Sequence, residues 1–237
     1  VRLSLSPDTD YLDITNKVKA VSKGGAVGSY RTSRPNVIQV FGKCSKKQGP
    51  FAIAIEKPDS FFGTLVKENL PKYGISVGGQ VKTGPIECGQ RIQELVVFST
   101  PLVDCLERCN KNSFNLTAEA LLKTLSAKVL GGRGSWQGGT EVLSRYLVSL
   151  GIKPTEFNLD DGCGLSRENK ISTNALTKVL RDMYKSPDWL VYKETLAVGG
   201  EDGTIRKYFK DDKYQGKIFG KTGYISGVKA FSGICYT

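Results

Sequence analysis

The stretch GKIFGKTGYISGVKAFSGICYT, residues 216–237, decides the fold of this chain. Its β-branched and aromatic residues are separated by glycines, a pattern that predicts two antiparallel strands. The stretch carries the triplet Lys221-Thr222-Gly223, and the same triplet also occurs at residues 82–84. A three-residue motif recurs easily by chance, so its surroundings must decide which copy carries chemistry.

The residue after the glycine separates the two copies. Lys-Thr-Gly is one signature of serine enzymes that act on acyl-D-alanine peptides and β-lactams. In that chemistry the triplet lies on an edge strand beside the nucleophile, and the next residue donates its backbone N–H to the developing oxyanion. Pro85 follows the first copy and has no N–H, whereas Tyr224 follows the second. The sequence therefore favours Lys221 over Lys82.

The pattern of the chain changes near residues 99–101, where we place a domain boundary. Residues 1–98 are predicted to be mainly β. Strand-like runs occur at 36–42 (NVIQVFG), 51–56 (FAIAIE), 79–84 (GQVKTG) and 91–99 (RIQELVVFS), and one helix is predicted over 58–75. Residues 99–237 are predicted to alternate helices with loops before the final strands. The predicted helices cover 99–113, 115–126, 140–151 and 172–186, and a glycine-rich loop is predicted over 131–139.

The chain of 237 residues contains no histidine. This absence excludes Ser-His-Asp and Cys-His mechanisms and any metal site that depends on histidine. A serine hydrolase built from this sequence needs a lysine as its general base. We expect no metal and no cofactor.

The six cysteines form no recognisable disulfide framework. Cys105 and Cys109 share one face of a predicted helix, where they are too far apart for easy disulfide geometry. No further ligands for zinc are near them in the sequence. We interpret the cysteines as small buried hydrophobic residues.

The net charge of +11 is spread over scattered lysines and arginines. The sequence contains no zinc-finger or RNA-binding signature, so we expect a solvated basic surface rather than nucleic-acid binding. No apolar run is long enough to span a membrane. Val1 begins the chain with neither an initiator Met nor a signal peptide, and we expect a processed form or a piece of a longer protein.

Three further segments accompany the second triplet in a fixed order. They are NKNSFN (110–115), DDGCGLSRENKIS (160–172) and LAVGGEDGTIRKYF (196–209). With Lys221-Thr222-Gly223 they resemble the class-C low-molecular-mass penicillin-binding proteins, which are D-alanyl-D-alanine carboxypeptidases and endopeptidases. The resemblance covers about residues 30–237 and is most specific after Pro101. Cys163 stands where the family usually has serine, and Phe114 stands where a small polar residue is commoner.

The resemblance implies an α/β (α+β) fold, a transpeptidase/β-lactamase-like antiparallel sheet flanked by helices. Residues 99–237 would form the C-terminal part of this domain, and residues 1–98 would be the tail of an inserted β-rich domain. Ser113 would relay a proton to the leaving group, and Asn115 would bind the amide side of the substrate. The substrate carboxylate would bind Lys221, which also polarises Ser113, with Thr222 and Gly223 of the triplet. The N–H of Tyr224 would complete the oxyanion hole.

The family's nucleophile belongs to a Ser-x-x-Lys motif upstream of Ser-x-Asn. The one match in this sequence, Ser226 to Lys229, follows the triplet, and we interpret it as coincidental because a strand would point its two ends to opposite faces. We therefore expect the acylating serine in a part of the protein that precedes Val1. The implied partners are peptidoglycan stem peptides, β-lactam antibiotics and that missing N-terminal part, and the implied location is periplasmic or extracytoplasmic.

Two other functions stay open on the sequence alone. A β-lactamase of the same fold would need a device that activates water for deacylation, and no segment matches the glutamate of class-A enzymes. A catalytically silent binding or scaffold module would keep the fold and lack the nucleophile. For Ser113 by itself, capping of the following helix is a third possibility.

Overall fold

The computed structural model describes residues 1–85, 93 and 96–237. The chain divides into two compact units, Val1–Gln93 and Glu94–Thr237, which are described separately below. The predicted domains, 1–98 and 99–237, and the origin of the first as part of an insertion stay predictions.

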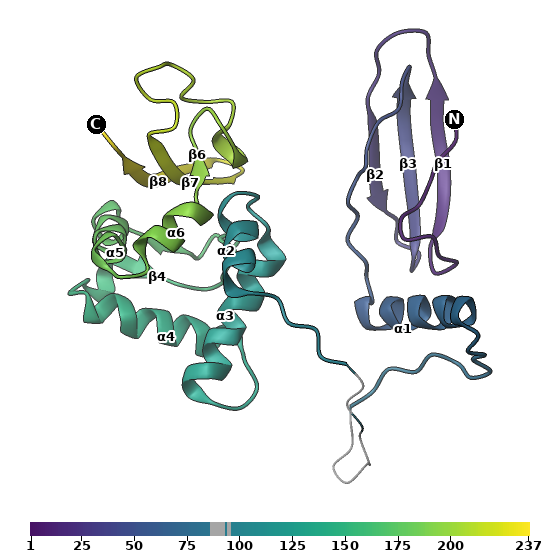
Figure 1. Ribbon diagram of the computed structural model, residues 1–237, viewed down its shortest axis with the longest axis horizontal. Coiled ribbons are helices and arrows are strands. Elements are labelled where there is room, and N and C mark those ends of the chain that lie inside the picture. The colour runs from purple at the N-terminus through teal and green to yellow at the C-terminus, as the bar shows by residue number, and fades with distance from the viewer. Residues whose placement is uncertain (86–92, 94–95) are drawn as a thin grey trace. The chain divides into compact units, whose positions relative to one another are not determined.

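The first unit combines a three-stranded sheet with one helix (Figure 1). Strand β3 (Val37–Cys44) lies in the centre, parallel to β1 (Asp13–Ala20) and antiparallel to β2 (Val27–Arg31). Ile38 and Val40 of β3 are buried and form its core. Helix α1 (Pro58–Asn69) continues into a short 3-10 turn, η1 (Leu70–Tyr73), as the sequence predicts.

Two strand predictions in this unit are wrong. Segments 51–56 and 79–84 are irregular and pair with no strand in the described part of the chain. In FAIAIE the solvent exposure still alternates along the segment: Ile53 and Ile55 are half-buried, while their neighbours are exposed. Alternation alone does not make a strand, since the backbone groups also need a partner. In the predicted strand 91–99, residues 93 and 96–99 are irregular as well, so the prediction is wrong there, and the remaining four lie outside the described residues.

The second unit is mainly helical around a small sheet. Figure 1 shows helices beside the sheet, and their bounds are α2 Leu102–Asn110, α3 Asn115–Leu130, α4 Trp136–Ser149, α5 Thr173–Lys185 and α6 Trp189–Thr195. Leu147, Ile152 and Ala175 form a buried cluster between α4 and α5. Two-residue strands β4 (Phe157–Asn158) and β5 (Lys170–Ile171) pair near this cluster.

The glycine-rich segment 131–139 is only partly a loop, so that prediction is corrected. Ser135 caps α4, because its Oγ accepts a hydrogen bond of 3.0 Å from the Gly138 N–H. Gly138 and Gly139 therefore belong to the first turn of the helix. They are buried where α4 meets α3, and a Cβ at Gly139 would lie 2.5 Å from Leu122 Cγ. These glycines permit close helix packing, whereas the sequence analysis predicted a loop for them.

The final stretch forms the predicted pair of antiparallel strands. Strand β7 (Ile218–Ile225) pairs with β8 (Val228–Cys235) along its whole length, and β6 (Ala197–Val198) adds to the other edge of β7. Ala197 of β6 and Ile218 of β7 form a buried cluster with Ile205. The predicted α+β class, with an antiparallel sheet flanked by helices, is confirmed.

The described cysteines are free thiols, and none of them is fully buried. Cys44, Cys105, Cys109 and Cys163 are only half-buried and Cys235 is exposed, so the prediction that the cysteines are buried is wrong for these five; Cys88 lies outside the described residues.

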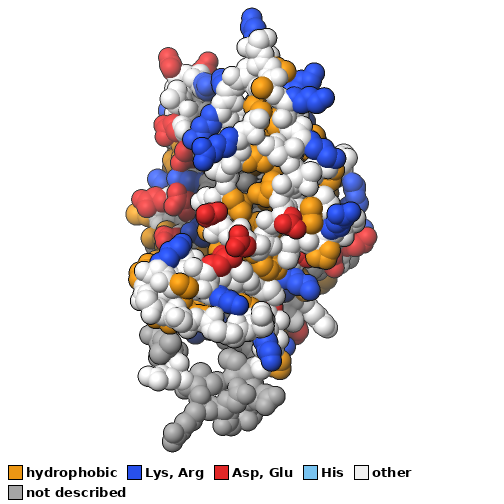
Figure 2. Space-filling view, turned by 90° about the vertical axis from the view of Figure 1, so that its right-hand side faces the viewer, with side chains coloured by type: hydrophobic (Ala, Val, Ile, Leu, Met, Phe, Trp, Pro, Cys, Tyr) orange, Lys and Arg blue, Asp and Glu red, His pale blue; other side chains and the backbone are white. Residues whose placement is uncertain are grey.

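Basic side chains are dispersed among acidic and hydrophobic ones on the face seen in Figure 2. Within the described residues no helix has both the length and the hydropathy to cross a membrane.

Two glycines on β7 provide a test of how tightly this sheet is packed. A Cβ at Gly220 would lie 2.8 Å from the Ser232 carbonyl oxygen and 2.7 Å from Phe231 Cζ. We expect Gly220→Ala to lower the free energy of unfolding by about 1–3 kcal/mol through overpacking. The matched variant Gly223→Ala, whose Cβ would find only the Ala230 Cβ at 3.5 Å, should change it by no more than about 0.5 kcal/mol. Urea unfolding of both variants measures the difference, and equal losses would contradict this packing.

Candidate active site

Ser113 lies in the short connection between α2 and α3, with a positive backbone φ of 54°. Non-glycine residues adopt this left-handed conformation only where the surroundings hold them there. The Ser113 Oγ accepts a hydrogen bond of 2.8 Å from the Nζ of Lys221 on β7. The structure thus brings together two residues that the sequence singled out 108 positions apart.

The capping alternative for Ser113 is wrong. Helix α3 begins at Asn115, and its N-cap is Phe114, which makes no side-chain cap. The Ser113 hydroxyl therefore leaves the helix N-terminus unbonded and faces Lys221 instead. Ser113 therefore does not cap α3.

Lys221 is half-buried, and burial lowers the pKa of its ammonium group below the ordinary lysine value. The neighbouring Cys109 thiol partly opposes this shift. Besides Ser113, the Nζ contacts the carbonyl oxygen of Thr222. No carboxylate pairs with Lys221 among the residues that the structure describes. Its charge thus remains available to an anionic ligand.

A cavity of about 560 Å³ opens at this hydrogen bond. Ser113, Asn115 and Lys221 line it together with Gly162 and Cys163. Its remaining lining is mostly apolar and comes from α2, α3 and α4, including Leu102, Leu106, Leu121, Leu125 and Leu143. Three of the predicted site residues therefore share one cavity within the second unit.

The other predicted residues follow Lys221 along β7. The Thr222 hydroxyl donates a hydrogen bond of 3.0 Å to Thr204 Oγ1, and Gly223 pairs with Ala230 of β8. Tyr224 is exposed, at 73% of its maximal area. Lys82 of the first triplet belongs to the other compact unit and is exposed in an irregular segment.

Asp161 builds the loop on the far side of the cavity. Its carboxylate accepts hydrogen bonds from the backbone N–H groups of Gly164 and Ser166, both 2.6 Å, and from the Asn169 side chain at 2.7 Å. Although burial alone raises the pKa of this carboxyl, these donors outweigh burial and lower it. These contacts hold the turn of the 160–172 segment in shape.

Glu119 of α3 is a residue that the sequence reading missed. Its carboxylate accepts hydrogen bonds from the N–H groups of Gly162 (3.2 Å) and Cys163 (3.1 Å), and from Trp136 Nε1 at 2.6 Å. Burial raises the pKa of this carboxyl, but the hydrogen bonds outweigh burial and lower it. Glu119 thereby ties the 160–172 loop to the helix that follows Ser113. One glutamate inside a helical pattern gives no sequence signal of such a contact.

Glu119, Asp161 and Cys163 place one ligand atom each within 4.8 Å of one another. They are the residues that could hold a metal ion in the described part of the chain. Both carboxylates are already engaged by N–H donors. Burial, followed by the hydrogen bond to Glu119, raises the pKa of the Cys163 thiol to about 11, which disfavours a thiolate ligand. Loop building accounts for this cluster.

The match to a family model covers the whole chain. Residues 1–237 match the D-Ala-D-Ala carboxypeptidase 3 (S13) family. This chain belongs to that family. The resemblance inferred from the four motifs is confirmed.

Relatives within the family are similar over most of this chain. A D-alanyl-D-alanine carboxypeptidase of Actinomadura sp. (strain R39) is 30% identical over 224 residues, which are 88% of this chain and 41% of that protein. The D-alanyl-D-alanine carboxypeptidase DacB of Haemophilus influenzae is 29% identical over 202 residues, 84% of this chain and 42% of the relative. The chain thus spans about two fifths of the length of these curated relatives.

A solved structure gives the same result for the fold. The crystal structure of penicillin binding protein 4 (dacB) from Haemophilus influenzae, complexed with a novel β-lactam, matches with a TM-score of 0.73 at 26% identity. The match covers 95% of this chain and 53% of that protein. The fold of this S13 family member is similar to that of about half of penicillin binding protein 4.

The lowered pKa of Lys221 has a measurable consequence in this family member. Between the folded pKa and the higher unfolded pKa, only the unfolded chain binds the proton, so the free energy of unfolding rises with pH in this window. We subtract the unfolding free energy of Lys221→Met from that of the native chain. We expect this difference to increase as the pH rises toward the ordinary lysine pKa. Urea unfolding at a series of alkaline pH values measures it. Other titrating groups cancel in the difference, and a flat or falling curve would contradict the shift.

Proposed function

We propose that this chain carries part of the active site of a serine DD-peptidase, which cleaves D-Ala-D-Ala bonds of peptidoglycan, with cross-links as a second target, and is acylated by β-lactams. The hydrogen bond of 2.8 Å between Lys221 Nζ and Ser113 Oγ, at the mouth of a cavity, carries this proposal. Membership of the S13 family and the names of the relatives support it.

Each predicted residue has a chemical task in this proposal. Ser113, polarised by Lys221, relays the proton to the leaving group, and Asn115 binds the amide side of the substrate. Lys221 and Thr222 hold the terminal carboxylate, since a cation and a hydroxyl suit a carboxylate well. The Tyr224 N–H stabilises the oxyanion. Two observations support these roles: Lys221 has no carboxylate partner in the part of the chain that the structure describes, and this part of β7 is exposed.

An open strand edge supports a peptide as the substrate. Strand β6 pairs only with Phe219 and Gly220 of β7, and within the described residues no strand pairs with the same edge over 221–225. A peptide in extended conformation can add to such an edge through main-chain hydrogen bonds. In the proposed complex, the stem peptide lies along β7 and its terminal carboxylate reaches Lys221.

We further propose that the acylating serine lies in a part of the protein outside these residues. The one Ser-x-x-Lys match, Ser226 to Lys229, is unsuited to the task. Ser226 lies in the turn between β7 and β8, and Lys229 points to the Tyr224 ring, with its Nζ 5.9 Å from the ring centroid. The greater length of the relatives supports a missing nucleophile segment. Peptidoglycan as substrate implies a periplasmic or otherwise extracytoplasmic location.

Absence of the nucleophile predicts how the 237-residue chain behaves alone. We expect no covalent adduct after incubation with benzylpenicillin, because a penicilloyl ester needs an activated serine. Intact-mass spectrometry measures the outcome, and the full-length protein is the positive control. A stoichiometric adduct on the chain would contradict the proposal, and peptide mapping to Ser226 would identify the dismissed motif as the nucleophile. Rapid hydrolysis of benzylpenicillin by the full-length protein would favour a β-lactamase, and no reaction a silent module.

The two triplets provide a matched pair of variants in the full-length protein. Lys221→Ala should lower turnover of a D-Ala-D-Ala peptide by about 30- to 1,000-fold, which corresponds to roughly 2–4 kcal/mol of lost transition-state stabilisation. Lys82→Ala, which changes an exposed residue of the other unit, should stay near the native rate, with a stability change within about 0.5 kcal/mol. Steady-state kinetics decides, with folding checked by circular dichroism. Equal losses would mean that the choice of triplet is wrong.

A further inference from the structure

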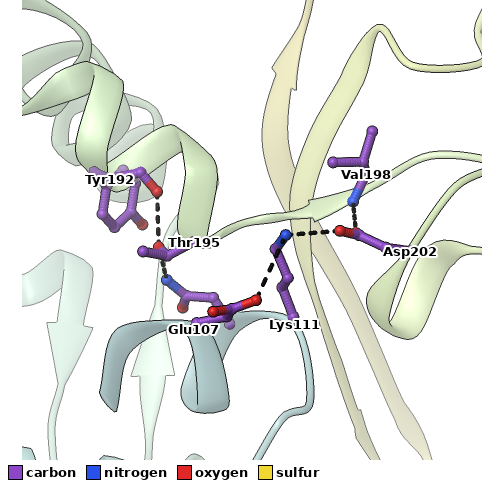
Figure 3. Close-up of polar contacts among 7 residues, drawn as sticks. Glu107, Lys111, Tyr192, Thr195, Val198 and Asp202 are labelled. Atoms are coloured by element: carbon purple, nitrogen blue, oxygen red, sulfur yellow. Dashed lines mark hydrogen bonds and ion pairs between the residues drawn. The ribbon is translucent and has the colours of Figure 1, made fainter. Parts of the chain in front are cut away.

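An ion pair between Lys111 and Asp202 lies next to the connection that contains Ser113. Lys111, two residues before Ser113, places its Nζ 2.7 Å from Asp202 Oδ2 (Figure 3). The Lys111 side chain is largely buried, at 19% exposure, and that of Asp202 is 39% exposed. The second oxygen of Asp202 accepts a hydrogen bond of 2.7 Å from the Val198 N–H on β6. Asp202 therefore joins the connection that carries Ser113 to the sheet that carries Lys221.

The turn that begins at Asp202 contacts both sides of the candidate site. Gly203, with a φ of 55°, lies against the backbone of Lys111, so that a Cβ there would be 3.0 Å from the Lys111 carbonyl oxygen. One residue later, Thr204 Oγ1 accepts the hydrogen bond from the Thr222 hydroxyl. Residues 202–204 thus contact Lys111 on the Ser113 side and Thr222 on the Lys221 side.

A second contact holds the end of α2 on the same side. The Asn110 side chain donates a hydrogen bond of 2.8 Å to Thr195 Oγ1, and the Thr195 hydroxyl donates one of 2.7 Å to the Tyr192 carbonyl oxygen (Figure 3). Thr195 is buried, with 1% of its area exposed. Asn110 fixes the end of the helix, whereas Lys111 is the last anchored side chain before the left-handed Ser113.

We propose that the Lys111–Asp202 ion pair is a positioning element of this site, which holds the Ser113 connection in register with Lys221. This inference rests on the proposed function for its catalytic consequence but not for its structural one. Asp202 and Lys111 are positioning residues here, because they act on the substrate only through Ser113 and Thr222. Tolerance of the site for a misplaced Ser113 is small, since a displacement of about 1 Å can cost on the order of 100-fold in rate.

The variant Asp202→Asn tests the ion pair selectively. Its side-chain oxygen can still accept from the Val198 N–H, while the NH2 group that replaces Oδ2 is a donor and cannot accept from the Lys111 ammonium. In the full-length protein we expect the second-order rate of acylation by a fluorescent penicillin to fall by about 10- to 100-fold, and Lys111→Met to behave alike. The double variant should lose no more than either single variant, because both remove one interaction. Lys111→Arg, which keeps the charge, should retain a rate within about threefold of the native one.

Glu107→Gln is the matched control. Glu107 is the other acidic neighbour of Lys111, at 3.8 Å, lies one helical turn back on α2, and makes no hydrogen bond or ion pair to residues 202–204, all of which the structure describes. Its loss should leave the acylation rate unchanged. Rates are expressed per folded molecule, with thermal unfolding as the check, so that a merely destabilised variant does not mimic a misplaced Ser113. Native rates in Asp202→Asn and Lys111→Met, or an equal loss in Glu107→Gln, would overturn the proposal.

A readout on the 237-residue chain separates this inference from the proposed function. The Phe114 N–H donates to the Arg108 carbonyl oxygen at 3.1 Å, and this bond reports on the Ser113 connection. Exchange of the Phe114 amide hydrogen, followed by NMR, should be at least about tenfold faster in Asp202→Asn than in the native chain, and unchanged in Glu107→Gln. Unchanged exchange in both would overturn the inference whatever the activity. A native full-length protein that no penicillin acylates would instead refute the proposed function.

Discussion

The hydrogen bond from Lys221 Nζ to Ser113 Oγ is the contact on which the rest of the site depends. It joins a connection between two helices to a strand near the end of the chain, and each partner needs its own support. Ser113 has a left-handed backbone conformation, which costs a non-glycine residue about 1–3 kcal/mol unless surrounding contacts compensate. Lys221 is half-buried with a lowered pKa, which means that its surroundings offer little compensation for its charge. The fold keeps both in place through neighbours rather than through the pair itself.

The fold around the site and its long-range contacts were only partly predictable from the sequence. The strands β7 and β8 and the helices α2, α3 and α5 followed from local composition and periodicity. The pairing of Ser113 with Lys221 followed from motifs in a fixed order. The role of Glu119, and of Lys111 with Asp202, could not be read from the chain, because each contact joins residues 43 to 91 positions apart in sequence. No short window of sequence contains both ends of such a contact.

The wrong predictions have the same physical origin. FAIAIE (51–56) has the alternation of a strand, but pairing depends on a second segment that local patterning does not specify. Gly138 and Gly139 look like loop residues, yet they lie in the first turn of α4, where α3 leaves no room for a larger side chain. The position of Ser113 before a helix is typical of a helix cap, but its hydroxyl accepts a hydrogen bond from Lys221 instead. In each case a tertiary contact overrides the local preference.

The distribution of charge around the cavity supports the choice of ligand. Glu119, Asp161 and Asp202 each accept hydrogen bonds from backbone N–H groups, so the nearby carboxylates serve to build loops. Lys111 is neutralised by Asp202, whereas Lys221 has no carboxylate partner within the described residues. A half-buried cation without a counter-ion is costly when the site is empty, and an anionic ligand removes that cost when it binds. The arrangement therefore supports the proposal of a substrate that ends in a carboxylate, and under this proposal the corresponding amide would bind more weakly because it carries no charge.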